Sequence, residues 1–159
     1  MQHWKATPHS LLEGGARAKV HLPALAYWES LPARGATKCA AAFDLGALGK
    51  VANHTIMLDV EHDPADFVVR SVGDALLSFL RGDQTGMRLS DDPQKTAGSE
   101  LWRQLAHVVE VGEPTVFETP YNGNFWDIYG IRQLVCPLSA TGDRVDRLFT
   151  TLVFVPKSG

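Results

Sequence analysis

The second half of the chain alternates strand-like and helix-like runs in one order, and this order constrains the fold more than any other feature. Two runs rich in apolar and β-branched residues come first, Thr55–Glu61 and Asp66–Val72. Two helix-like segments follow, Asp74–Arg81 and Ser99–Val111. Three more strand-like runs close the chain: Pro114–Thr119, Trp126–Leu138 and Arg144–Val155. This order predicts an α+β domain built on a five-stranded antiparallel sheet.

The boundaries of these segments carry their own signals. The turn sequence His62-Asp63-Pro64 separates the first two strands, and Ala140–Asp143 separates the last two. Asp74 and Gly82 are suited to begin and end the first helix, and Asn122–Asn124 is a plausible hairpin connection. Consecutive strands joined by short turns are antiparallel.

The N-terminal part predicts a loose arm followed by a helix. Residues 1–20 mix prolines, glycines and charges without periodicity, so we expect a flexible arm there and a single domain over residues 21–156. From Leu22 to Leu31 apolar residues recur at helical spacing, with Pro23 in the first turn and Pro32 ending the helix. The small and polar stretch Ala33–Ala42 predicts a loop.

The last strand is apolar on both of its faces. One set of alternate residues contains Phe149 and Val153, and the other contains Leu148, Leu152 and Phe154. A sheet wetted on one side would alternate apolar with polar residues, so both faces of this sheet should be covered. We expect the two later helices on one face. The Leu22–Leu31 helix, or the partner subunit of a homodimer, should cover the other.

Composition narrows the class of protein. The chain has 159 residues and a net charge of −3, and no basic cluster lies on any expected helix, so nucleic acid is an unlikely partner. No apolar run approaches the ~18–20 residues that span a bilayer, so no membrane partner is expected. Cys39 and Cys136 have neither metal-ligand nor disulfide-framework spacing, which favours a reducing, cytoplasmic location.

Nine short pieces, in order from about Leu22 to Val155, resemble one known family. They are Tyr27–Leu31, Pro32–Arg34, Phe43-Asp44, Leu58–Glu61, Phe67–Gly73, Thr85–Leu89, Gly112–Pro114, Pro137–Ser139 and Asp146–Leu148. With them the chain resembles a bacterial PAS-like family, the fifth profile family of PAS domains, first catalogued as a domain of unknown function. The family usually has prolines after the Phe-Asp pair and before the first strand, whereas here Leu45 and Val51–His54 stand at those places.

The resemblance implies a PAS-like fold: a five-stranded antiparallel sheet with helices on one face and an N-terminal flanking helix. It also implies a cytoplasmic module for signal transduction, in which a small molecule or a regulatory protein partner is bound. The alternative is a ligand-free interaction scaffold or homodimerisation domain. Neither reading implies a defined ligand.

Five residues are candidates for a ligand pocket between the sheet and the helices. Four are aromatic or amphipathic: Phe79, Trp102, Trp126 and Tyr129. Arg70 is the fifth, because an arginine between Val69 and Val72 could clamp a carboxylate. Arg70 could equally form an ion pair with an acid on a neighbouring strand, or point outward.

Other chemical patterns favour structural interpretations. Asp59, Glu61, His62 and Asp63, with His54 nearby, suggest a metal site, but a charged strand end explains them as well. His107 lies opposite the apolar sector of its helix, so its side chain should face water and could not bind the iron of a haem held inside the domain. No nucleophile-elbow, phosphate-loop or HExxH motif is present. We therefore expect no cofactor, no metal and no enzymatic activity.

Overall fold

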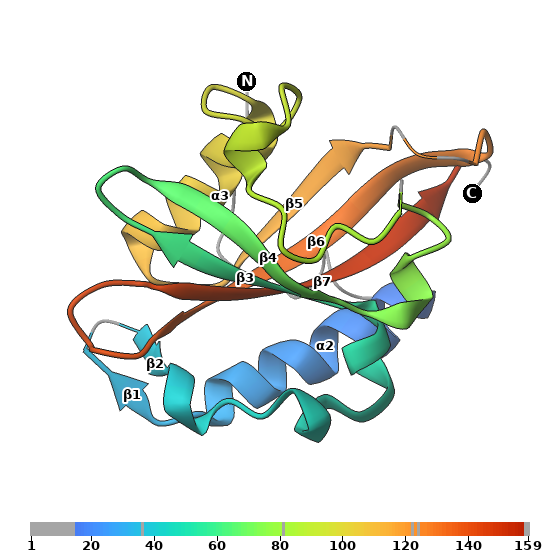
Figure 1. Cartoon of the computed structure of the whole chain (residues 1–159). Coiled ribbons are helices and arrows are strands. Elements are labelled where there is room, and N and C mark those ends of the chain that lie inside the picture. Colours follow the sequence, from blue (N-terminus) through green and yellow to red (C-terminus); the bar gives the residue numbers. More distant parts are fainter. Residues whose placement is uncertain (1–14, 36, 81, 122, 124, 158–159) are drawn as a thin grey trace.

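A computed structural model describes residues 15–157 except 36, 81, 122 and 124. Within these residues seven strands form one sheet, and helices and turns pack on both of its faces (Figure 1). The long strands are β3 (Thr55–Glu61), β4 (Asp66–Val72), β5 (Thr115–Pro120), β6 (Ile128–Ser139) and β7 (Arg147–Pro156). Within the described residues, no helix is long and apolar enough to cross a membrane.

The central strands are antiparallel, and a short parallel extension is added at one end. The long strands lie side by side in the order β4, β3, β7, β6 and β5, and each pairs antiparallel with its neighbour. At the C-terminal end of β6, residues Leu138 and Ser139 pair in parallel with β2 (Thr37–Cys39). Strand β1 (Ala33–Arg34) then pairs antiparallel with β2. The fold is a mixed α/β fold.

The five-stranded, wholly antiparallel PAS-like sheet expected from the sequence is therefore wrong. The difference lies in residues 33–39, which were expected to be a loop but contribute β1 and β2. Thr37 holds this addition in place because its hydroxyl donates to the Pro137 carbonyl at 3.3 Å, next to the paired residues of β6. Strands of two and three residues are too short to show a periodicity in the sequence.

Helix α2 (Gly15–Ser30) covers one face of the sheet. It begins earlier than expected, so Pro23 lies inside the helix, on an exposed position, and residues 15–20 of the expected arm are helical. The rest of that arm, residues 1–14, lies outside the described residues. Trp28 Nε1 donates to the Pro137 carbonyl at 2.7 Å, and His21 Nδ1 lies 2.7 Å from the Thr151 hydroxyl. These contacts fix α2 against β6 and β7.

After β2 the chain covers the remainder of the α2 face with two tight helical segments. These are η1 (Ala40–Ala42) and η2 (Leu45–His54), and Asp44 caps η2 by accepting from the Gly46 amide at 3.0 Å. Gly73, just after β4, packs so close to η2 that an added Cβ would lie 2.3 Å from the Asn53 carbonyl oxygen. Only glycine fits at that position.

Helix α3 (Glu100–Val111) lies on the opposite face, as the sequence predicts. Ser99 caps it by accepting from the Trp102 amide at 3.2 Å, and Gly112 ends it with φ 72°. Its buried side places Leu105 and Val108 against the sheet, with Leu101 half-buried at the edge. The prediction that both faces of the sheet are covered is confirmed.

The helix expected over Asp74–Arg81 is wrong. Over the described residues 74–80 the chain forms a tight turn, η3 (Asp74–Leu76), and a second turn at residues 77–80 in place of a regular helix, and Gly73 rather than Asp74 stands at the start of η3. Its apolar residues point in different directions instead of forming one helical stripe. Leu76 is fully buried, whereas Phe79 stacks on Phe154 with ring centroids 4.2 Å apart. From there to α3 the chain crosses the sheet as an irregular connection, residues 82–98, which contains the short helical turn η4 (Leu89–Asp91) and several other hydrogen-bonded turns.

Candidate functional site

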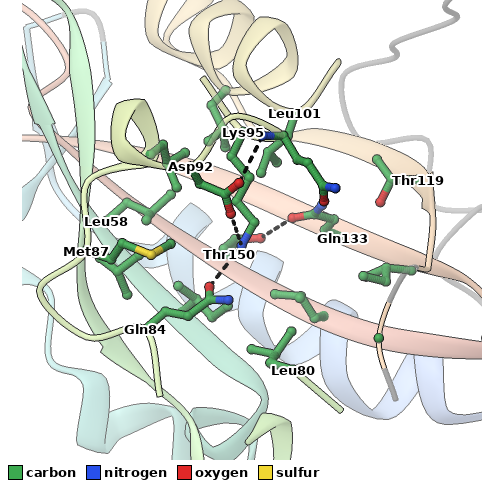
Figure 2. A pocket seen from close by; sticks show the side chains of 18 of the residues that line it. Leu58, Leu80, Gln84, Met87, Asp92, Lys95, Leu101, Thr119, Gln133 and Thr150 are labelled. Carbon is green, nitrogen blue, oxygen red and sulfur yellow. Dashed lines mark hydrogen bonds and ion pairs between the residues drawn. The ribbon is translucent and has the colours of Figure 1, made fainter. Parts of the chain in front are cut away.

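A cavity of about 820 Å³ lies between the sheet and the structures that cover its α3 face. Strands β3, β6 and β7 form its floor, and α3, the turn at residues 77–80 and the 82–98 connection form its walls (Figure 2). The volume falls within the ~300–1,000 Å³ of typical small-molecule sites. The fold thus leaves room for a ligand on one face of its sheet.

The walls of the cavity are mainly aliphatic. The floor contributes leucines from β3 and β7 and an isoleucine from β6. The walls contribute leucines from α3 and from the turn at residues 77–80, and a methionine from the connection. Representative members are Leu58, Leu152, Ile131, Leu101, Leu80 and Met87. Burial of the apolar part of a ligand against such side chains contributes roughly 25 cal/mol per Å².

Two polar side chains stand in the apolar floor. Thr150 on β7 donates a hydrogen bond to Gln133 Oε1 on β6 at 3.3 Å, and both residues are at least nine-tenths buried. Gln133 Nε2 has two protons to donate, and nothing among the described residues accepts from it. Because Gln133 lines the cavity, an acceptor on a ligand could take up a hydrogen bond from this nitrogen.

Lys95 brings a positive charge from the connection into the cavity. Its Nζ donates to Gln84 Oε1 at 3.0 Å and lies 4.0 Å from Asp92 Oδ2. Burial lowers the pKa of Lys95, although the Asp92 charge acts in the opposite direction. Figure 2 shows Lys95, Gln84 and Asp92 next to the Gln133–Thr150 pair. The polar groups of the cavity therefore form one cluster.

Three carboxylates line the cavity, and one of them, Asp92, lies 4.0 Å from Lys95 Nζ. Asp83 accepts from the Thr85 hydroxyl and amide, at 2.6 and 3.0 Å, and these hydrogen bonds lower the pKa of Asp83. Asp92 Oδ1 accepts from the Gln94 amide at 2.9 Å, and Glu100 completes the set from α3. The cavity lining is thus acidic apart from Lys95.

The connection that forms one wall is held to edge strand β4 by polar contacts. The Val69 amide donates to the Met87 carbonyl at 2.9 Å, and the Gly86 amide donates to the Val69 carbonyl at 2.7 Å. Asp66 accepts from the Ser90 hydroxyl at 2.5 Å and from the Phe67 amide at 2.8 Å. Burial raises the pKa of Asp66, but these hydrogen bonds outweigh it and leave the pKa below its ordinary value.

The structure brings only one of the five sequence-predicted ligand residues to the cavity. Phe79 lines it. Arg70 is exposed and pairs with Asp59 on β3 at 2.9 Å, as one of the alternatives held. Trp102 packs edge-on against Phe67, with ring centroids 5.0 Å apart.

The other two candidates are at the surface. Trp126 and Tyr129 expose 83% and 62% of their surface, near the start of β6. They do not line the cavity, and a ligand-binding role for them stays a prediction.

Sequence reasoning missed the polar cluster, yet one signal for it was present. Gln133 is the one polar residue in the run Ile131–Leu138 apart from Arg132, and a glutamine in a buried strand usually has a specific partner. Lys95 had no such signal. It lies in a stretch of polar residues whose path over the sheet follows from tertiary structure alone.

The patterns considered for metal and cofactor chemistry have ordinary partners. Asp59 binds Arg70 and lies 3.6 Å from Arg147, Glu61 pairs with Arg88, and His62 Nε2 lies 2.9 Å from the Val145 carbonyl. No group of three or more histidine, cysteine or acidic side chains within the described residues could hold a metal ion. Cys39 and Cys136 are both free, and burial raises the pKa of the Cys136 thiol.

Comparisons with family profiles, curated proteins and solved structures gave no significant match to this chain. The resemblance to the PAS-like family therefore gains no support from them. The cavity and its polar cluster are the basis for a functional conclusion.

Proposed function

We propose that this protein is a non-enzymatic sensory or regulatory module that binds a small molecule in the cavity beneath the 82–98 connection. The observation that carries the proposal is the cavity itself, about 820 Å³, apolar with a few converging polar groups. Such a composition is typical of ligand sites. Histidine, cysteine and serine are absent from its described lining, which favours binding over nucleophilic catalysis.

The position of the cavity supports a way of passing on a signal. One wall is the connection, which is held to β4 by hydrogen bonds and by the buried side chain of Leu89. A ligand shifts a conformational equilibrium only if it binds two states unequally. A ligand that contacts the connection has this property, because its contacts depend on where the connection lies. The free thiols of Cys39 and Cys136 are consistent with work in the cytoplasm.

The proposal is tested by filling the cavity. Native mass spectrometry of the protein purified from its own cell should show the chain with a bound small molecule. The variant Ile131→Trp adds bulk on the cavity floor and should give the mass of the chain alone. Ala106→Trp places the same side chain on the exposed side of α3 and should keep the ligand. A clean mass for the unaltered protein would contradict the proposal.

A second candidate function, a homodimerisation or interaction scaffold, rests on a different observation. Phe125, Trp126 and Tyr129 are exposed aromatic side chains close together in sequence. Exposed aromatic clusters are enriched at protein interfaces. Light scattering after size-exclusion chromatography should give a dimer mass for the unaltered chain and a monomer mass for Trp126→Ser. A monomer in both cases removes this candidate.

A further inference from the structure

The polar cluster of the cavity has unused hydrogen-bond donors. The ammonium of Lys95 carries three protons, and Gln84 Oε1 accepts one of them at 3.0 Å. Asp92 Oδ2, 4.0 Å from the same nitrogen, is too distant for a hydrogen bond. The amide nitrogen of Gln133 adds two further protons that no described residue accepts. Lys95 Nζ and Gln133 Nε2 therefore both have protons that no described residue accepts.

The charge of Lys95 decides which kind of acceptor suits the cluster. A partly buried ammonium whose only hydrogen-bond partner is a neutral amide is incompletely compensated. Hydrogen bonds between a cation and an anion are about twice as strong as neutral ones. A carboxylate on a ligand would therefore gain more from this cluster than a hydroxyl or a carbonyl group.

The carboxylates around Lys95 limit the ligand to one negative charge. Lys95 is the one cation among the described lining residues, whereas Asp83, Asp92 and Glu100 are acidic. A second negative charge on the ligand would have no cationic partner and would be repelled by these groups. Phosphates and dicarboxylates are thus disfavoured.

From these three observations we infer that the cavity takes an amphipathic monocarboxylate. Its apolar body packs against Leu58, Leu101 and Leu152, and its carboxylate accepts hydrogen bonds from Lys95 Nζ and Gln133 Nε2. This inference rests on the proposed function and adds the chemical class of the ligand to it. Figure 2 shows the two donors near each other, within a ring of aliphatic side chains.

Probes with one tail and different head groups test the inference. Isothermal titration calorimetry would compare decanoate, decanol, decylamine and decyl phosphate on the unaltered chain and on Lys95→Met. Decanoate should bind the unaltered chain at least about tenfold more tightly than the other three, because it alone offers a single negative charge. The variant should lose this advantage for decanoate and keep its affinity for decanol. Lys50→Met, an exposed lysine outside the cavity, is the matched control and should change nothing.

The outcomes distinguish a failure of the head-group assignment from a failure of binding in the cavity. Equal affinities for decanoate and decanol, or an unchanged decanoate affinity in Lys95→Met, would overturn the monocarboxylate inference. If the Ile131→Trp variant then still loses both probes, binding in the cavity stands and only the head-group assignment fails. Tightest binding of decylamine or decyl phosphate would also overturn the inference. Failure of every probe to bind the unaltered chain would count against the inference and the proposed function together.

Discussion

The two faces of the sheet are built from the same strands and yet differ in how completely they are filled. On the α2 face, Leu134, Phe149 and Val153 pack with the helix into a continuous core. On the α3 face the intervening residues of the same strands, Gln133, Thr150 and Leu152, border the cavity. Because side chains alternate across a strand, neighbouring residues of β6 and β7 serve different layers.

Buried polar groups behave differently on the two faces. On the α2 face, the Thr151 hydroxyl lies 2.7 Å from His21 Nδ1, so helix and sheet hold each other. On the cavity face, Gln133 keeps an amide nitrogen without an acceptor, and Lys95 has a neutral amide as its hydrogen-bond partner. The polar pair on the α2 face therefore joins a helix to the sheet, whereas the polar groups on the other face border a space that no described side chain fills.

The largest expected effect comes from one leucine on each face. Leu134 and Leu152 lie on the adjacent strands β6 and β7. Leu134 is paired across the strands with Thr151, and Leu152 is paired with Gln133. Leu134→Ala opens a new hole in the filled core and should lower the free energy of unfolding by about 4 kcal/mol. Leu152→Ala enlarges a space that already exists and should cost about 2 kcal/mol. Urea denaturation measures both, and equal losses would contradict the contrast between the faces.

The polar attachment of the cavity wall predicts an intermediate effect. Asp66→Asn removes the negative charge that accepts from Ser90 and should lower stability at neutral pH by about 1–2 kcal/mol. The folded pKa of Asp66 is lowered, so the unaltered chain should hold this contribution above the ordinary value of 3.8 and lose it as the pH falls through the lowered folded value. The difference between the two proteins should shrink in that acidic range. Thermal unfolding followed against pH checks this prediction.

Hydrogen exchange locates the effect of the same substitution. Amides of the 82–98 connection should exchange faster in Asp66→Asn, whereas those of α2 should not change. Faster exchange throughout the chain would show that Asp66 supports the whole fold rather than the cavity wall.

The smallest expected effect is a gain of stability in α3. Gln104 is 1% exposed, and neither its amide oxygen nor its nitrogen has a hydrogen-bond partner among the described residues. Gln104→Met keeps a similar shape and removes the unsatisfied groups, so the free energy of unfolding should rise by about 1 kcal/mol. Urea denaturation tests this, and a loss of stability would show that the amide has a partner in solution.

The elements that the sequence predicts best are those with a long pattern and a clear end. The bounds of β3 and β4 are as expected, and α3 begins after its serine cap and ends at its glycine. In these segments local propensity, periodicity and capping agree, so little depends on distant residues.

The missed elements depend on tertiary contacts. β1 and β2 are too short for a pattern, and β2 exists because Pro137 and its neighbours offer a free edge beside β6. The turn after β4 has helical spacing, but its apolar residues divide between the core and the cavity. Lys95 and Gln133 are thirty-eight residues apart in the chain. Local sequence patterns carry no information about whether two such distant residues meet in the fold.

The alternation along β7 limits how sequences with this architecture can diverge. At Phe149, Thr151 and Val153, substitution is restricted by the volume beneath α2. At Thr150 and Leu152, under the proposed function, the restriction comes from the ligand that binds in the cavity. Descendants that adopt new ligands should therefore accumulate replacements at every second position of this strand, and the positions between them should stay nearly constant.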